Sequence, residues 1–236
     1  YAKWVNPNIS IGDVKYGTIA EAIKNANEGD VITLKAGVYT ENITINKANI
    51  SIIGANENID PNKQTRNEEA VIKGNIDVAA NGFILNGVKL SGTSTVTVTS
   101  AVKVLKILYV YSDSTGMASA VDSNHNRKSV IYGYEGINVN DLVMSNCYFN
   151  IGSSVYCKEV MRFYGVVTNA NIKNNYFTNS AAPTISEVIG LAQIAGIINI
   201  SDNEFRFPTS NYLLMIGEWY NGGNVVIENN IFAGLN

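Results

Sequence analysis

The chain has 236 residues and a mass of 25.5 kDa, enough for one sizeable core or at most two small ones. Its formal net charge is −3 and 16% of its residues are charged, whereas nucleic-acid-binding domains that rely on phosphate contacts are normally basic, so we expect no nucleic-acid partner. No apolar run approaches the roughly 18 residues needed to cross a bilayer, so we expect no membrane insertion.

The first predicted element is a short helix over residues 18–26. Ile19, Ala22, Ile23 and Ala26 follow one another at helical spacing and form one apolar stripe. Thr18 and Glu21 form a capping-box pair, which satisfies free backbone donors at the helix start. We therefore expect a helix that buries one face.

Short strands follow the helix. A polar turn over 28–30 precedes a strand over 31–34, and further strands are predicted over 38–40, 43–45 and 50–52. Apolar residues alternate with polar ones in the later strands, which indicates strands with one buried face, joined by very short turns.

The run TIAEAIKNANEGDVITLKAGVYTENITINKANISIIGA, residues 18–55, resembles the N-terminal cap and first coil of right-handed parallel β-helix proteins of the pectate-lyase-like and pectin methylesterase-like kind. Residues 1–17 resemble the strand that often precedes this helix. The resemblance implies an all-β fold, a right-handed single-stranded parallel β-helix with a short N-terminal capping α-helix. Activity does not follow from it, because enzymes and non-enzymes share this fold.

The second half of the chain repeats itself. Four segments align, over 142–149, 170–177, 198–205 and 225–232, and their final Phe recurs at intervals of 28, 28 and 27 residues. A fixed period with short strands predicts a β-solenoid in which each period is one coil. Equivalent side chains would then stack as ladders: an aromatic one of Phe149, Phe177, Phe205 and Phe232, and an aliphatic one of Met144, Ile172, Ile200 and Ile227.

Polar residues precede each Phe of the repeat. Asn146, Asn174, Asp202 and Asn229 stand three residues before it, and Cys147, Asn175, Asn203 and Asn230 follow them. Asn tolerates left-handed backbone, so we predict a sharp coil corner here, with Asn175 and Asn203 in the left-handed conformation. Stacked Asn side chains can also bond one another between coils.

Earlier coils are predicted over 83–90 and 96–111, and polar stretches over 56–69 and 112–136 interrupt the period. Such insertions often form loops on the working side of a solenoid. We expect one domain over 1–236, with a cap over 1–30 and coils over 31–236. Because the chain begins at Tyr1 and its last coil carries no capping element, we expect it to be part of a longer protein.

Few residues are of the types that act in catalysis or bind metals. The two cysteines, Cys147 and Cys157, make neither a disulfide framework nor a zinc site, and we expect free thiols, although a bridge stays open. The single histidine, His125, lies with Asp122 and Arg127 in a polar stretch that we expect to be an exposed insertion.

The enzyme signatures of the resembling families are missing. Polygalacturonase-like hydrolases need adjacent aspartates and Gly-His-Gly, and methylesterases need two aspartates with Gln and Arg in strand motifs. Pectate-lyase-like elimination needs calcium carboxylates and a basic residue, and Arg206-Phe207-Pro208 matches only the start of the lyase motif. We expect no metal site and no cofactor, with calcium left open.

One group of residues remains as a candidate active site. Glu159 and Glu187 occupy the same place in successive coils, 18 residues before a ladder Phe, with Arg162 nearby. These three are candidate catalytic residues, since two carboxylates near 5 Å suit retaining glycoside hydrolysis. Ligand-binding candidates are Tyr164, Gln193, Glu218, Trp219 and Tyr220. The competing interpretation, which we prefer, is that these are solvated surface charges.

Three functions remain open. The first is a non-catalytic extracellular module, a surface stalk, adhesion or carbohydrate-recognition domain on a cell or virion surface, with a polysaccharide or cell-surface glycan as partner. The second is a polysaccharide lyase or glycoside hydrolase. The third is a phage tail or capsid fibre whose chains form a homotrimer. The missing signatures favour the first, so we lean towards a non-enzyme whose further partners are other domains of the same chain.

Overall fold

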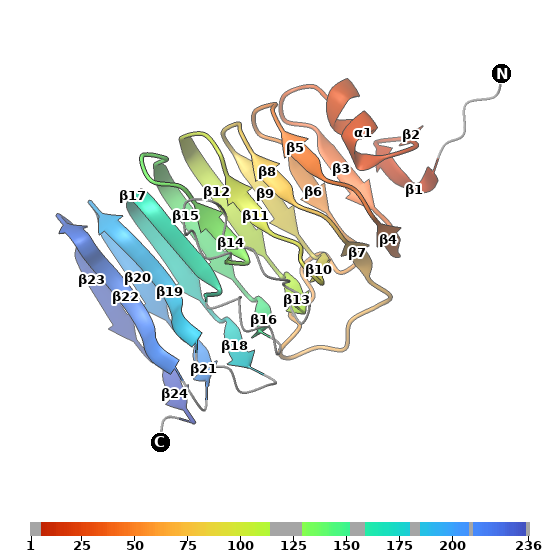
Figure 1. Cartoon of the computed structure of the whole chain (residues 1–236). Coiled ribbons are helices and arrows are strands. Elements are labelled where there is room, and N and C mark those ends of the chain that lie inside the picture. The colour runs from red at the N-terminus through yellow and green to blue at the C-terminus, as the bar shows by residue number, and fades with distance from the viewer. Residues whose placement is uncertain (1–5, 114–128, 152–158, 180–184, 208–209, 235–236) are drawn as a thin grey trace.

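The computed structural model describes residues 6–113, 129–151, 159–179, 185–207 and 210–234. Over these ranges the protein is nearly all-β, with one short helix and parallel strands arranged in long sheets. Figure 1 shows the strands stacked side by side along the long axis, from β1 near the N-terminal end to β22, β23 and β24 near the other end. The strands fall into three rows.

Row 1 contains the strands that later carry the candidate site. Its members, in spatial order, are β5 (Ile43–Ile45), β8 (Ile76–Val78), β11 (Val96–Val98), β14 (Ile131–Gly133), the first half of β17 (Met161–Lys173), β19 (Ile185–Ile194) and β22 (Ser210–Asn221). All neighbours in this row are parallel.

Row 2 is joined to row 1 through β17, whose second half belongs to it. Its members are β3 (Val31–Leu34), β6 (Ser51–Ile53), β9 (Phe83–Asn86), β12 (Val102–Leu108), β15 (Val139–Ser145), the second half of β17, β20 (Ile197–Ser201) and β23 (Asn224–Glu228). Because β17 runs continuously through both rows, its backbone hydrogen bonds join them into a single sheet.

Row 3 forms the separate eight-stranded sheet. Its members are β4 (Gly37–Tyr39), β7 (Ala70–Ile72), β10 (Lys89–Ser91), β13 (Tyr111–Asp113), β16 (Tyr148–Ile151), β18 (Tyr176–Asn179), β21 (Glu204–Arg206) and β24 (Ile231–Ala233). Each repeat of the chain supplies one strand to each row, so apolar side chains of all three rows meet in one continuous core.

The N-terminal end is closed by the helix α1 (Ile19–Asn25) and by two antiparallel strands, β1 (Asn6–Ile11) and β2 (Val14–Tyr16). The predicted apolar stripe is buried. Thr18 caps the helix by accepting a hydrogen bond from the backbone N–H of Glu21 at 3.0 Å. The Glu21 carboxylate bonds the backbone N–H of Gly17, one residue before the cap, so the predicted capping box closes one residue further out.

The predicted ladders are confirmed. Phe149, Phe177, Phe205 and Phe232 stack in order, with ring centroids 4.9–5.7 Å apart. The first three are fully buried, whereas Phe232 in β24 is 43% exposed because no further described strand covers it. Met144, Ile172, Ile200 and Ile227 likewise pair across row 2.

The corner prediction is wrong by one residue. The positive φ values belong to Asn146, Asn174, Asp202 and Asn229, at 54–57°, not to Asn175 and Asn203. Asn175 and Asn203 instead form a buried ladder, in which Nδ2 of Asn175 donates to Oδ1 of Asn203 at 3.0 Å. A left-handed residue turns the chain, and the next side chain then points inward. There the Asn175 amide accepts from the backbone N–H of Cys147 and donates to the carbonyl oxygen of Met144, both in the preceding repeat, and the Asn203 amide in turn accepts from the backbone N–H of Asn175.

The predicted interruption over 56–69 lies away from the candidate site, whereas the described end of the one over 112–136 contains β14 and supplies residues to row 1. The segment 56–69 packs at the turns between rows 2 and 3, where Arg66 pairs with Glu69 and donates to the carbonyl oxygen of Tyr109 at 3.0 Å. Asn62 donates to the carbonyl oxygen of Cys147 at 3.2 Å. Cys147 is a buried free thiol. Cys157 and the group of Asp122, His125 and Arg127 lie outside the described residues.

Candidate functional site on row 1

The sequence candidates gather on the outward side of row 1, over β17, β19 and β22. Met161 and Phe163 point into the core and are fully buried, so Arg162 between them points outward. Strand pairing places Arg162 beside Tyr132 of β14 on one side and Gly190 of β19 on the other. The site therefore crosses several strands that are far apart in the sequence.

Two successive bulges shape this face. In the first bulge, two residues of β17, Tyr164 and Gly165, lie opposite the single residue Ala192 of β19. In the second, on the other side of β19, three residues of β22 lie opposite the same Ala192: Gly217, Glu218 and Trp219. Gly217 has a φ of +72°, a conformation that residues with a Cβ rarely adopt. Bulges re-aim side chains and are common beside functional sites. Here they bring Glu218 and Trp219 back towards β17.

Arg162 lies flat over β19 and makes contacts on both sides. Its Nη1 is 2.9 Å from Glu187 Oε1, and its Nη2 is 2.5 Å from Glu218 Oε2. Gly190 makes room for this path, because a Cβ there would lie 2.5 Å from Nη1. Burial by itself would lower the pKa of Arg162, but the hydrogen bond to Glu218 and the charge of Glu187 raise it above its usual value. Arg162 is thus fully charged and doubly paired.

Glu159 and Glu187 form a buried carboxyl pair. Glu159 is 1% exposed and Glu187 is 5% exposed. The Ser129 hydroxyl donates to Glu159 Oε2 at 2.6 Å. Burial raises the pKa of Glu159 to about 7, the Ser129 hydrogen bond opposes the rise, and the charge of Glu187 together with a hydrogen bond between the two carboxyls adds to it. Glu159 therefore holds its proton below neutral pH.

Aromatic rings surround the charged groups. Tyr164 packs under the Arg162 guanidinium, whose Cζ lies 4.5 Å from the ring centroid. The Trp219 ring lies 5.3 Å from Tyr164, and Tyr132 contacts both Tyr164 and Tyr134, at 6.0 and 4.8 Å. Trp219 is 50% exposed and Tyr134 is 39% exposed. We call the four rings of Tyr132, Tyr134, Tyr164 and Trp219 the aromatic platform.

The two remaining ligand-binding candidates lie at its edge. Gln193 donates from Nε2 to the carbonyl oxygen of Tyr164 at 2.8 Å, so its amide holds the bulge of β17. Tyr220 pairs with Gln193 across the strands and is 54% exposed, with its ring beside Gly222. Gln193 supports the platform, and Tyr220 extends the exposed aromatic surface beyond it.

The preferred interpretation of the charges as solvated surface groups is wrong for Glu159, Glu187 and Arg162. All three are at least 95% buried. Glu159 and Glu187 belong to successive repeats, and the parallel register brings these repeats into contact, so that residues 28 positions apart become neighbours. Glu218, at 39% side-chain exposure, is the member of the network that reaches solvent.

Sequence reasoning missed Ser129, Tyr132, Tyr134 and Gly190. Gly190 stands 28 residues after Arg162, so the period of the repeat could have identified it as a neighbour of Arg162. Tyr132 and Ser129 stand 30 residues before Arg162 and Glu159, because the repeat is longer there. Counting by the regular period could not find them.

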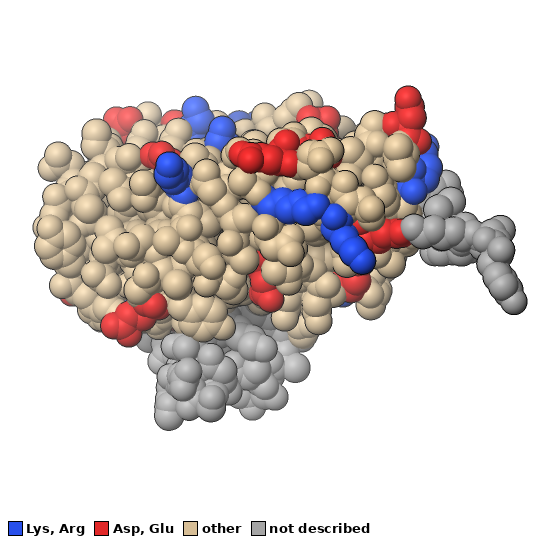
Figure 2. Space-filling model, turned by 90° about the horizontal axis from the view of Figure 1, so that it is seen from above, with Lys and Arg blue, Asp and Glu red and all other residues tan. Residues whose placement is uncertain are grey.

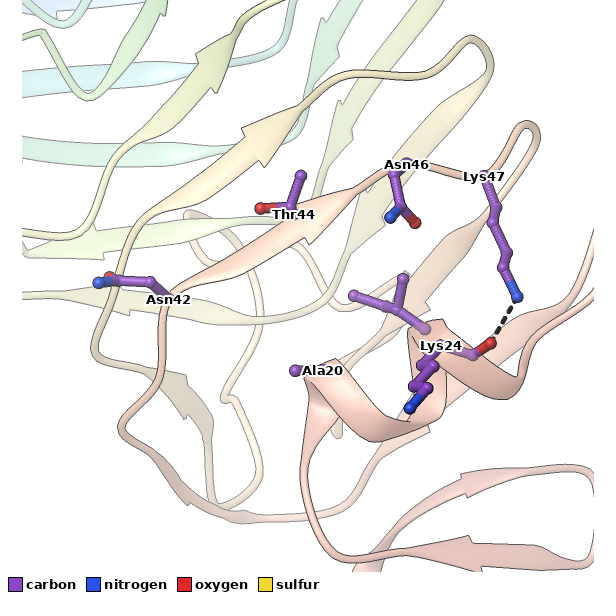
Figure 3. Close-up of a pocket in the computed structure, with 7 residues that line it drawn as sticks. Ala20, Lys24, Asn42, Thr44, Asn46 and Lys47 are labelled. Carbon is purple, nitrogen blue, oxygen red and sulfur yellow. Dashed lines mark hydrogen bonds between the residues drawn. The ribbon is translucent and has the colours of Figure 1, made fainter.

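Two hollows lie elsewhere on the surface. One, of about 330 Å³, lies between α1 and β5 and is lined by Ala20, Ile23, Lys24, Asn42, Thr44, Asn46 and Lys47 (Figure 3). The ammonium of Lys47 is engaged there, since it donates to the carbonyl oxygens of Lys24 and Ala26 at 2.7 and 2.5 Å. The other, of about 340 Å³, lies over β15, β17 and β20 and includes Asp141, Asn169, Asn171 and Asn199. Neither contains a predicted site residue.

Within the described ranges, no three His, Cys, Asp or Glu side chains are grouped so that they could hold a metal ion. Helix α1, the one described helix, is too short to span a membrane. Figure 2 shows a face on which Lys and Arg side chains are few, lie among Asp and Glu, and are surrounded by uncharged residues. Comparison with protein-family models, with curated proteins and with solved structures found no match in any of the three.

Proposed function

We propose that the chain is a right-handed parallel β-helix that acts as a non-catalytic recognition module, on a cell or virion surface, and binds glycans through the aromatic platform. The fold proposal is supported by the three rows of parallel strands, by ladders at intervals of 27–28 residues, and by the helix over one end. Such a scaffold presents outward side chains of successive coils as one surface.

The aromatic platform is the observation that carries the functional proposal. Sugar rings present apolar C–H faces, and exposed aromatic rings with a polar edge are the side chains that bind such faces while hydrogen-bonding the hydroxyls. Trp219 and Tyr134 are large, partly exposed rings, and the two bulges hold Trp219 against Tyr164. A strand without bulges would alternate its side chains and leave Trp219 without this neighbour.

Binding of soluble oligosaccharides by the purified protein tests this proposal. Trp219→Ala removes the most exposed ring of the platform and is expected to weaken binding at least ten-fold, about 1.4 kcal/mol. Tyr148→Ala is the matched control, because Tyr148 is an outward aromatic residue of row 3 that stacks between Tyr111 and Tyr176. Equal loss in both variants, or no binding of any glycan class by the parent protein, contradicts the proposal.

Glycoside hydrolysis is the second candidate, favoured by the paired carboxyls and by the raised pKa of Glu159, a property of general acids. Two observations count against it. Both carboxyls are at least 95% buried, and they hydrogen-bond each other directly, whereas in retaining enzymes the two carboxyl groups stand roughly 5 Å apart with the sugar carbon between them. Release of reducing sugar by the parent protein, lost in Glu187→Gln while the fold persists, would establish catalysis instead.

A further inference from the structure

The charges around the aromatic platform select the kind of glycan that it can take. Four charged or titratable side chains act on one another here: the carboxyls of Glu159, Glu187 and Glu218, and the guanidinium of Arg162. With Glu159 protonated, the group carries one net negative charge. When that proton is lost, it carries two. At no pH near neutrality is it positive.

The guanidinium is unavailable to an anionic ligand. The side chain of Arg162 is 4% exposed, both of its Nη atoms are engaged by carboxylates, and one face lies on the Tyr164 ring. A uronate or sulfate would have to displace Glu218 or Glu187 from it, leaving that carboxylate without its partner. For Glu187, whose side chain is 7% exposed, losing the partner would leave an unpaired buried carboxylate, which is costly.

The charge that reaches solvent is negative. Glu218 is 39% exposed, and Arg162 binds its Oε2, which leaves the carboxylate anchored at one oxygen. The next residue, Trp219, has a half-exposed ring that packs on Tyr164, the same ring that lies under Arg162. An anchored carboxylate next to an indole suits a cation, because the carboxylate supplies charge and the ring face attracts the same cation. Anchoring also reduces the side-chain entropy that binding would otherwise cost.

We propose, on the basis of the glycan-binding function above, that the ligand is a glycan containing amino sugars, whose protonated amine pairs with Glu218 while a sugar face lies on Trp219. Polyuronates are excluded from this surface, because their carboxylates meet Glu218 and find no free cation there among the described residues. The surface therefore differs in charge from one that binds acidic plant polymers.

The test compares three probes of equal length at mildly acidic pH: glucosamine oligomers, their N-acetylated counterparts and galacturonate oligomers. Calorimetric titration is expected to show that glucosamine oligomers bind about three- to five-fold more tightly than the acetylated ones, the size of a partly exposed ion pair. This preference decreases with added salt, and galacturonate oligomers bind at least ten-fold more weakly than either.

Glu218→Gln is expected to remove the preference for the amine while leaving binding of the acetylated oligomer within about two-fold, since Trp219 remains. Glu228→Gln, which neutralises an exposed carboxylate on row 2, is the control and keeps the preference. Thermal unfolding of both variants verifies that the fold persists, and the salt dependence of the parent protein tests the same ion pair without a substitution.

The outcomes separate the two proposals. Tight binding of galacturonate, or an amine preference that survives in Glu218→Gln, overturns the selectivity but leaves the glycan-binding function standing if Trp219→Ala still abolishes binding. Binding of none of the three probes contradicts both proposals.

Discussion

Glu159→Gln tests the buried carboxyl pair at the centre of the site. In the folded protein Glu159 accepts from the Ser129 hydroxyl and shares a hydrogen bond with Glu187. A protonated carboxyl can do both, accepting with one oxygen and donating with the other. The amide of Gln has the same shape and the same two capacities. The substitution therefore imitates the protonated state and prevents ionisation.

The magnitude follows from the pKa of Glu159, which rises from 4.5 to about 7 on folding. Between these two values the folded protein holds a proton that the unfolded chain releases, so the free energy of unfolding decreases as pH rises. Proton binding stabilises the fold fully below pH 4.5, and the contribution is lost as pH rises through about 7. The difference between the two pKa values corresponds to about 3 kcal/mol.

Urea unfolding of the parent and of Glu159→Gln, from about pH 5 to about pH 8, measures this contribution. Subtracting the free energy of unfolding of one protein from that of the other removes the contribution of all other titrating groups, which both proteins share. We expect similar stabilities at the acidic end and a variant that is more stable by about 2–3 kcal/mol at the basic end. Parallel pH curves for the two proteins would refute the raised pKa of Glu159.

Six further substitutions, at five positions, test the ladders, the corner and the path of Arg162, each by urea unfolding. Phe177→Ala is expected to cost about 3–5 kcal/mol, whereas Phe232→Ala, at the exposed end of the same ladder, costs less than half as much; equal costs would mean that the ladder does not carry the core. Asn174 has a left-handed backbone, so Asn174→Gly is tolerated and Asn174→Val lowers the free energy of unfolding by about 1–2 kcal/mol. Asn175→Gly lowers it by about 1–3 kcal/mol, because the side-chain hydrogen bonds are lost. If Gly is tolerated equally at both positions, the assignment of the corner is wrong. Gly190→Ala pushes the Arg162 side chain from its path, lowers stability and weakens binding of glucosamine oligomers. An unchanged amine preference would show that Arg162 does not hold Glu218 in place.

The N-terminal cap, the ladders and the repeat length followed from sequence because they depend on local chemistry and on a period. The apolar stripe of Ile19, Ala22 and Ile23 and the Phe of each repeat were predicted, and all but the terminal Phe232 are buried as expected. A parallel register converts a constant spacing into spatial contact, so a period read from the chain is sufficient to name the stacked side chains. The corner was misplaced by one residue because Asn suits both the left-handed position and the ladder beside it.

The site itself was decided by tertiary structure. Glu159, Glu187 and Arg162 could be named from their spacing, but spacing does not reveal burial, and the charges were taken for surface groups. Several neighbours of the site lie outside the regular period. Ser129 and Tyr132 stand 30 residues before Glu159 and Arg162, and Trp219 packs on Tyr164 after a bulge in β22. A bulge changes which face a side chain occupies without changing the apolar pattern. The sequence alone therefore determined the repeating scaffold, and the three-dimensional pairing determined which outward side chains meet on it.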